Sequence, residues 1–344
     1  MIGLIMDERK FLILQAIVDD YITTAAPVGS RTISRKSGVG FSPATIRNEM
    51  SDLEQLGYLA QPHTSAGRVP SYKAYRLYVD QLLNVSKLPP EEREKMNAYL
   101  SKKTDQVGTL IRSAAAVISD ATRYTSVIVA PKLSTLRIRN LQMVPVSDTL
   151  ALMVIVTNAG IVKDTVIRVP EGITPDMLYE ISRMLTEQLA DKPIEAVRQL
   201  FAELIRDMGE HRRLLAEAMQ VIEEKMTHAD ESDVVIGGGA NMLSYPEYQD
   251  AGKAQNFLSV LESRDKLQKA LAGGSGMEVT IRIGPENGLP ELSDCSVLTA
   301  TYQAGDDSVG RLGIIGPTRM NYNRAISVLR YMGMALSELL SDRK

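Results

Sequence analysis

Basic side chains gather in one early segment of the sequence, residues 28–78. Seven Lys and Arg residues stand there against three Asp and Glu, which leaves a local charge of +4 on a chain whose net charge is −3. A basic segment on an otherwise acidic protein suits attraction to a polyanion such as nucleic-acid phosphate, because that attraction acts on the face that docks. Charge alone fits an ordinary solvated surface equally well. The types and spacing of particular residues therefore have to distinguish nucleic-acid binding from an ordinary surface.

The stretch 41–57 predicts a helix with one small, polar face. Ser42 is a good N-cap, Pro43 is favoured in the first turn, and Gly57 is a good stop. The predicted inward face consists of Ile46, Met50, Leu53 and Leu56. The predicted outward face consists of Ala44, Arg47, Asn48, Ser51 and Gln55. Arg and Asn side chains can reach base edges in the major groove, and a helix that is slim at its start can enter that groove.

Neighbouring segments give this helix the context of a winged helix-turn-helix. The predicted elements are helices over 7–24 and 30–38, a turn that contains glycine, the helix 41–57, and a hairpin with strands over 58–61 and 68–71. This order of helix, turn, helix and hairpin is typical of modules that bind double-stranded DNA. The alternative is a winged helix that binds protein, with Arg47 and Asn48 as ordinary surface residues.

Ten residues of this module are candidate DNA contacts. We expect Ser42, Thr45, Arg47, Asn48 and Ser51 at the major groove, Arg31, Arg35, Lys36 and Arg68 on the phosphate backbone, and His63 in the wing. Arg68 follows a glycine and could reach a phosphate or the narrow minor groove. For His63 an ordinary position in the wing is favoured over base recognition.

Metal and nucleophile chemistry finds little support in the sequence. The histidines, His63, His211 and His228, are too scattered for a local metal site, and neither HExxH nor CxxC occurs. We expect no metal, no cofactor and no catalysis, although carboxylates or lysines alone could serve an enzyme. Cys295 precedes an apolar run and is expected to be a buried structural thiol. Gly237–Gly239 lacks the spacing of a phosphate-binding loop and is expected to be a bend.

Composition indicates a soluble, multidomain protein. With 344 residues, 44% of them hydrophobic, the chain has material for two or three cores. No apolar run approaches the roughly 20 residues that span a bilayer. One cysteine excludes an internal disulfide framework. We therefore expect a cytoplasmic protein without a membrane anchor.

Motifs near both ends of the chain carry a family resemblance. The N-terminal motifs are Val28-Gly-Ser-Arg-Thr-Ile-Ser34, the run 41–59 and His63-Thr-Ser-Ala-Gly-Arg-Val-Pro-Ser71. The C-terminal motifs are Ile283-Gly-Pro-Glu-Asn287, Cys295-Ser-Val-Leu298 and Gly310-Arg-Leu-Gly-Ile-Ile-Gly-Pro-Thr-Arg-Met-Asn-Tyr322. With these motifs the chain closely resembles the HrcA family of heat-inducible transcription repressors. One departure is Ser71-Tyr-Lys-Ala-Tyr75, which stands where the family favours a Thr-Asp-Lys-Gly-Tyr type of run.

The resemblance implies a bacterial, cytoplasmic homodimer that binds an inverted-repeat operator of the CIRCE type upstream of chaperone operons. Members of the family repress these operons until heat inactivates them, and they depend on the chaperonin GroEL/GroES for activity. The resemblance also implies a GAF-like domain with a second, dimerising domain inserted into it.

We predict a multidomain α+β fold on this basis. Strand-like runs over 126–169 suggest hairpins, a helix opens at Pro175, and strand-like runs resume only near Met277. The predicted domains are a winged helix-turn-helix over 1–88, a GAF-like antiparallel α+β domain over 100–190 and 276–344, and an inserted, mainly helical dimerisation domain over 191–275.

An apolar stripe in the predicted insertion is a candidate dimer seam. The stripe consists of Leu214, Leu215, Ala218, Ile222 and Met226. Its spacing fits a helix packed in the core of one subunit equally well, and the resemblance favours the seam. Two rival functions stay open at this point: a small-molecule-responsive regulator that uses the GAF-like domain as an effector pocket, and an enzyme for which the winged helix is only a docking module.

Overall fold

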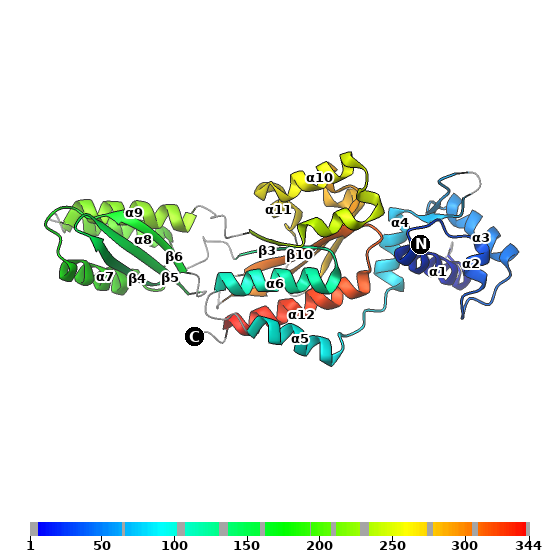
Figure 1. Cartoon of the computed structure of the whole chain (residues 1–344), viewed down its shortest axis with the longest axis horizontal. Coiled ribbons are helices and arrows are strands. Elements are labelled where there is room, and N and C mark those ends of the chain that lie inside the picture. Colours follow the sequence, from blue (N-terminus) through cyan, green and yellow to red (C-terminus); the bar gives the residue numbers. More distant parts are fainter. Residues whose placement is uncertain are drawn as a thin grey trace.

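The computed structural model of the chain is elongated and has three units along its long axis (Figure 1). The structure describes residues 6–63, 66–101, 107–130, 137–158, 162–192, 194–207, 211–227, 234–273, 278–304 and 309–341. Within these, the N-terminal unit spans 6–83, the central unit 84–130 and 234–341, and the inserted unit 137–227. Helices and antiparallel sheets make the fold α+β, as the sequence predicts.

The N-terminal unit is a group of helices with a short hairpin. Its elements are α1 (Glu8–Thr24), α2 (Ser30–Ser34), α3 (Pro43–Gln55), β1 (Leu59–Ala60), β2 (Val69–Pro70), α4 (Tyr72–Leu77) and the π-helical turn η2 (Tyr78–Leu82). Side chains cap the helix starts: Asp7 accepts from the Lys10 amide, and Ser71 from the Ala74 amide. Ala25, in the left-handed conformation (φ 55°), ends α1. The helices and hairpin lie where the sequence predicts them.

The central unit contains a five-stranded antiparallel sheet with the strand order β7-β3-β10-β9-β8. Its strands are β3 (Thr125–Val129), β7 (Val234–Gly237), β8 (Thr280–Ile283), β9 (Cys295–Gln303) and β10 (Val309–Pro317). Its α-helices are α5 (Pro90–Ser101), α6 (Val107–Thr122), α10 (Ala251–Leu261), α11 (Arg264–Ala270) and α12 (Tyr322–Ser341). Short 3₁₀ turns are η6 (Gly239–Ser244), η7 (Pro246–Tyr248), η8 (Gly284–Asn287) and η9 (Pro290–Leu292).

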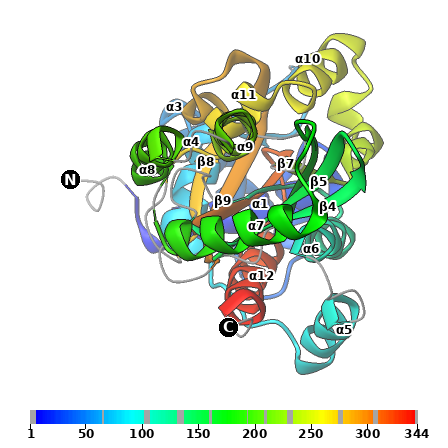
Figure 2. The same cartoon turned by 90° about the vertical axis from the view of Figure 1, so that its left-hand side faces the viewer.

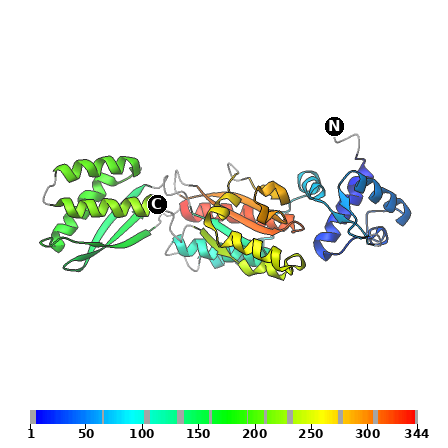
Figure 3. The same cartoon turned by 90° about the horizontal axis from the view of Figure 1, so that it is seen from above.

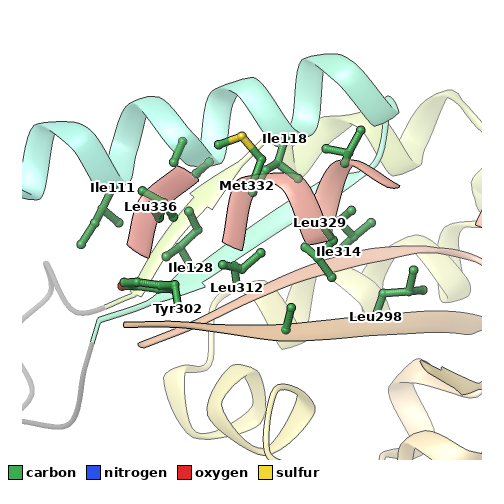
Figure 4. Packing of buried hydrophobic residues seen from close by; sticks show 14 of the residues in the cluster. Ile111, Ile118, Ile128, Leu298, Tyr302, Leu312, Ile314, Leu329, Met332 and Leu336 are labelled. Carbon is green, nitrogen blue, oxygen red and sulfur yellow. The ribbon is translucent and has the colours of Figure 1, made fainter. Parts of the chain in front are cut away.

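Both faces of this sheet are buried, which explains its nearly continuous apolar strands. Ile128 points to the face covered by α6 and α12, where it meets Leu312 and Met332 (Figure 4). Its neighbour Val127 belongs to the core on the other face, together with Phe257 of α10. Adjacent residues of a strand point to opposite faces, so β3 serves both cores.

The inserted unit has its own three-stranded antiparallel sheet, with strand order β4-β5-β6. Its elements are β4 (Ile138–Ser147), β5 (Leu150–Thr157), β6 (Val162–Arg168), α7 (Pro175–Leu189), α8 (Ile194–Asp207) and α9 (Arg212–Thr227). The helices lie on one side of the sheet (Figures 2 and 3). Hydroxyls of α7 satisfy the edge of β4, because Ser182 accepts from the Met143 amide at 2.9 Å and Thr186 from the Leu141 amide at 3.0 Å.

The observed division of the chain differs from the predicted domain boundaries. Residues 137–190 were assigned from sequence to the GAF-like domain. As far as they are described, they belong instead to the inserted unit, together with helices α8 and α9. Residues 234–275, assigned to the insertion, supply edge strand β7 and helices α10 and α11 of the central unit as far as they are described. The prediction was wrong because hairpin-linked strands carry no local signal of the sheet they join. The insertion enters after β3 and leaves before β7.

The predicted dimer seam on α9 is also corrected. Leu214, Leu215, Ala218 and Ile222 have no exposed surface within the single chain, because α9 packs against α8 and β6. The side chain of Met226 lies outside the described residues. A side chain that is already buried in its own subunit has no surface left for a partner. The stripe is therefore helical core.

The first two of the three consecutive glycines, Gly237 and Gly238, pack closely against α6. A Cβ on Gly237 would lie 2.5 Å from the Ala115 carbonyl oxygen, and one on Gly238 would lie 1.8 Å from the Ser119 hydroxyl. Gly238 also has φ 61°, a conformation that favours glycine. These glycines make a tight bend, as the sequence suggests. Among the described helices, none is long and apolar enough to cross a bilayer.

Candidate nucleic-acid interface

The outward face of α3 is exposed at the positions that the sequence predicts. Arg47, Asn48 and Ser51 face solvent, whereas Ile46 and Leu53 on the opposite face have no exposed surface. An amphipathic helix is held by its apolar stripe and leaves its polar side free. The Arg and Asn side chains therefore project from the surface of the unit on a rigid element.

The first turn of α3 is held by a side-chain cap. The Ser42 hydroxyl accepts from the Thr45 amide at 3.1 Å and lies 2.9 Å from the Thr45 hydroxyl. Ser42 is exposed and Thr45 is half-buried. Both residues were predicted as groove contacts from sequence. Their observed interaction is with each other, so they position the start of the helix, and a base contact by either stays a prediction.

Helix α1 supports α3 from behind through an ion-pair cluster. The Lys10 ammonium lies 2.7 Å from a Glu49 carboxylate oxygen and 3.1 Å from one of Asp52. The hydrogen bond to Glu49 raises the pKa of Lys10. Arg9 stacks over the Phe41 ring with its guanidinium carbon 5.2 Å from the ring centroid. Sequence reasoning missed this cluster, because its partners lie about 40 residues apart and no local pattern links them.

The four predicted phosphate contacts divide into two pairs. Arg31 and Arg35 are exposed, and neither forms an ion pair with any residue that the structure describes. Lys36 instead pairs with Asp20 at 2.8 Å and donates to the Ala16 carbonyl at 3.3 Å. It joins α2 to α1 and has less freedom to meet a phosphate than the sequence suggests.

Arg68, like Lys36, is already paired with a carboxylate. It donates through Nε to a Glu54 carboxylate oxygen at 2.9 Å, and another guanidinium nitrogen lies 2.8 Å from the same oxygen. Its backbone forms a bridge with Val28, with both N–H···O distances 2.9 Å. A Cβ on Gly67 would lie 2.4 Å from the Val28 carbonyl oxygen, so a glycine is needed beside this bridge. The hairpin is thereby tied to α3 and to the segment before α2.

His63 lies at the tip of the hairpin and is exposed. Its carbonyl accepts from the Ala66 amide at 2.9 Å, which closes the turn. The intervening Thr64 and Ser65 lie outside the described residues. His63 is thus an exposed residue of the hairpin, and a DNA contact by it stays a prediction.

Metal-ligating side chains and the cysteine are the remaining candidates for chemistry in the sequence. No group of three or more His, Cys, Asp or Glu side chains suitable for a metal occurs there. Cys295 is fully buried, with its sulfur 2.9 Å from the Tyr248 hydroxyl. Burial raises the pKa of the Cys295 thiol to about 12, so it is protonated and unreactive at neutral pH. The expected structural thiol is confirmed.

Comparison with known proteins agrees with the sequence motifs. A family model described as the HrcA protein C-terminal domain matches residues 108–326. The heat-inducible transcription repressor HrcA of Ruminiclostridium cellulolyticum is 42% identical and aligns over 96% of each chain. The protein of the same name from Symbiobacterium thermophilum is 41% identical over 97% of this chain and 98% of its own.

A solved structure supports the fold independently. The crystal structure of a hypothetical protein at 2.2 Å resolution superimposes with a TM-score of 0.68 and 25% sequence identity, covering 98% of this chain and all of that one. The similarity of fold and of sequence thus extends over both ends and the insertion. The chain belongs to the HrcA family of heat-inducible transcription repressors.

Proposed function

We propose that the N-terminal unit is a winged helix-turn-helix that binds double-stranded DNA, and that the protein is a transcription repressor in the bacterial cytoplasm. The observation that carries this proposal is the exposed face of α3. Arg47 and Asn48 are both exposed on it, Arg47 forms no ion pair with a described residue, and Lys10 and Glu49 fix the helix from behind. Side chains of these two types can hydrogen-bond base edges in the major groove.

The flanking cations divide the remaining work. Arg31 and Arg35 are free to meet phosphates beside the groove, which adds sequence-independent attraction. Lys36 and Arg68 are held by Asp20 and by Glu54. Their main effect is to hold α2 and the wing against α1 and α3, and a phosphate has to compete with a carboxylate for either of them.

We place the homodimer contact on the open face of the inserted sheet. The strands β4, β5 and β6 lie on the side of that unit away from its helices (Figures 2 and 3). Val144, Leu152 and Val166 form one cross-strand rung there, and Val156 and Val162 form another. Val166 is 55% and Val162 53% exposed in the single chain. An uncovered sheet face that carries two apolar rungs is typical of an association surface.

Two-fold symmetry then sets the form of the operator. A symmetric dimer presents the same helix twice, so its site is an inverted repeat with half-sites separated by whole turns of DNA. The N-terminal and inserted units lie at opposite ends of the long axis (Figure 1). Both α3 helices meet one duplex only when the dimer axis runs roughly along that length, with the two N-terminal units at the same end.

Membership of the family extends the proposal to regulation. We propose that the operator is of the CIRCE type, lies upstream of chaperone operons, and is released on heating. A domain held by only about 5–15 kcal/mol loses its folded population over a narrow rise in temperature. Loss of the dimer also removes two-site binding, which multiplies the effect. The chaperonin GroEL/GroES would restore the active protein, so misfolded clients that occupy it would relieve repression.

The test is a mobility-shift titration with three duplexes: an inverted repeat, its single half-site and a scrambled sequence. We expect the inverted repeat to bind tightest, binding to fall steeply on mild heating, and added chaperonin with ATP to restore it. Equal binding to all three duplexes would refute operator recognition. The central unit, which we propose to be GAF-like, gives the alternative outcome: a small molecule retained in native mass spectrometry that changes the shift would indicate an effector-responsive regulator.

A further inference from the structure

The C-terminal motifs of the chain face the N-terminal unit. Arg319, in the turn before α12, is a charged residue with only 8% of its surface exposed. It donates to the Ile22 carbonyl in the last turn of α1 at 3.0 Å, and forms a two-pronged ion pair with Glu247 of η7. Its guanidinium also stacks on the Tyr245 ring, 5.4 Å from the centroid. A cation at a helix C-terminus is favoured by the helix dipole.

Helix α4 docks on the same end of the central unit. Arg76 donates to the carbonyl of Ile281 on edge strand β8 at 2.9 Å and pairs with Glu286 at 3.3 Å. Asp80 of η2, which follows α4, holds the same guanidinium at 2.6 Å. The edge strand thus meets a charged side chain instead of an open ladder.

Tyr72, one of the departures from the family pattern, takes part in this contact. Its hydroxyl donates to Asp294 at 3.3 Å, and Asp294 also pairs with Lys253 at 2.9 Å. The ring lies on Gly284, where a Cβ would stand 2.6 Å from it. Gly284 also has φ 58°, so two separate constraints favour glycine.

The connection between the two units is tied down along α12. Asn323 donates to the Asn84 carbonyl at 2.9 Å and accepts from the Ser86 amide at 3.1 Å. Ser327 donates to the Ser86 carbonyl at 2.6 Å. Leu88 is buried. The segment that follows η2, residues 84–89, is therefore a strap held on the central unit.

We propose that these contacts form a rigid joint that sets the direction of α3 relative to the dimer axis, with Arg319 and Arg76 as its positioning residues. The inference rests on the proposed DNA binding for its consequence, but not for the joint itself. Gly284, Glu286 and Arg319, which belong to the motifs that mark the family at its C-terminal end, thereby acquire a role: they form the seat of the DNA-binding unit.

The physical consequence follows from two-site binding. The second half-site is bound at an effective concentration that depends on how narrowly the second α3 is held in place. The N-terminal unit lies beyond the joint, so bending at the joint changes the direction of α3 relative to the rest of the subunit (Figure 1). Arg319 is nearly buried, so removing its charge leaves Glu247 and the Ile22 carbonyl without a partner. A loosened joint is expected to weaken binding to an inverted repeat by about 10- to 100-fold and to leave single half-site binding unchanged.

The joint is tested first without DNA. The sole cysteine, Cys295, is buried, so spin labels attach only at introduced sites such as exposed Ser37→Cys and Gln268→Cys. Pulsed electron–electron double resonance gives the distribution of distances between labels on the N-terminal and central units, and an excess of unlabelled protein restricts the measured pairs to one subunit. We expect a narrow distribution for the parent and for the matched control Arg330→Gln, an exposed arginine of α12. We expect a broad one for Arg319→Gln.

Thermal melting shows whether Arg319→Gln is folded. Arg76→Gln is the second variant in case it is not, because Arg76 is less buried than Arg319. Narrow distributions in both variants would overturn the joint. The second readout is affinity for inverted repeats of different spacer length. The parent is expected to prefer one spacing sharply and the variants to lose that preference; a sharp preference retained in a protein with a broad distribution would overturn the link to DNA. A parent that binds no DNA would refute the proposed function alone.

Discussion

The replacement Arg47→Ala separates base recognition from general attraction to DNA. Arg47 is exposed and forms no ion pair with any described residue, so its removal should change the free energy of unfolding by no more than about 0.5 kcal/mol. On the operator, loss of a two-pronged contact with a base is expected to weaken each half-site by about 1–3 kcal/mol. That corresponds to about 5- to 140-fold for each half-site, since about 1.4 kcal/mol is a tenfold change. The dimer carries the change twice.

Arg35→Ala is the matched control, because Arg35 is also exposed and also forms no ion pair among the residues described. We expect it to weaken specific and scrambled duplexes alike and to reduce the salt dependence by about one ion per subunit. Fluorescence anisotropy on both duplexes over a range of salt concentrations measures both effects. Should Arg47→Ala weaken the two duplexes by the same factor, our division between base contacts and phosphate contacts would be refuted.

Three further predictions concern the fold. Val166→Lys on the open sheet face should convert dimer to monomer in sedimentation equilibrium, whereas Leu214→Ala in the core should instead lower the free energy of unfolding by about 2–5 kcal/mol; the reverse result would restore α9 as the seam. Gly238→Ala should lower the melting temperature more than Gly172→Ala. Both glycines have a positive φ, which costs a non-glycine residue about 1–2 kcal/mol, but only the Cβ added at Gly238 would meet a side chain. The Cys295 thiol should resist alkylation until the protein unfolds. The pKa of the folded thiol is raised to about 12, whereas the unfolded thiol loses its proton near its ordinary pKa of 9.0. The protonated thiol therefore contributes fully to the stability of the fold below pH 9.0, and this contribution falls as the pH rises above it. Comparing the stability of the parent and of Cys295→Ala at alkaline pH checks this.

Features of the structure that depend on local sequence could be predicted. The cap of Ser42, the stop at Gly57 and the polar face of α3 all follow from residues within one or two turns of each other. The partners of Lys36 and Arg68 could not be predicted, because each lies on another element. Basic residues look alike in sequence, and only the tertiary contact shows which cations are already paired.

The allocation of strands to sheets failed for a related reason. Strand β3 pairs with β7, which follows the whole insertion in sequence, and Ser126 lies opposite Gly237. Neither segment contains a local signal that identifies the other as its partner. The apolar stripe of α9 shows the same limit, since periodicity establishes that a face is covered but not by what. Motif resemblance located the residues near Arg319 correctly but gave no role for them. That role depends on a contact between residues 297 positions apart.

The separation of the three units bears on how heat would end repression. The surface proposed to bind DNA and the surface proposed to bind the partner lie at opposite ends of the molecule (Figure 1). Heat therefore does not have to damage the α3 face, because a monomer with an intact α3 has already lost its second half-site. Loss of the inserted unit's association, or of the joint that directs α3, is sufficient. The least stable of these elements would set the temperature of the proposed release, so the sensor need not be the element proposed to contact DNA.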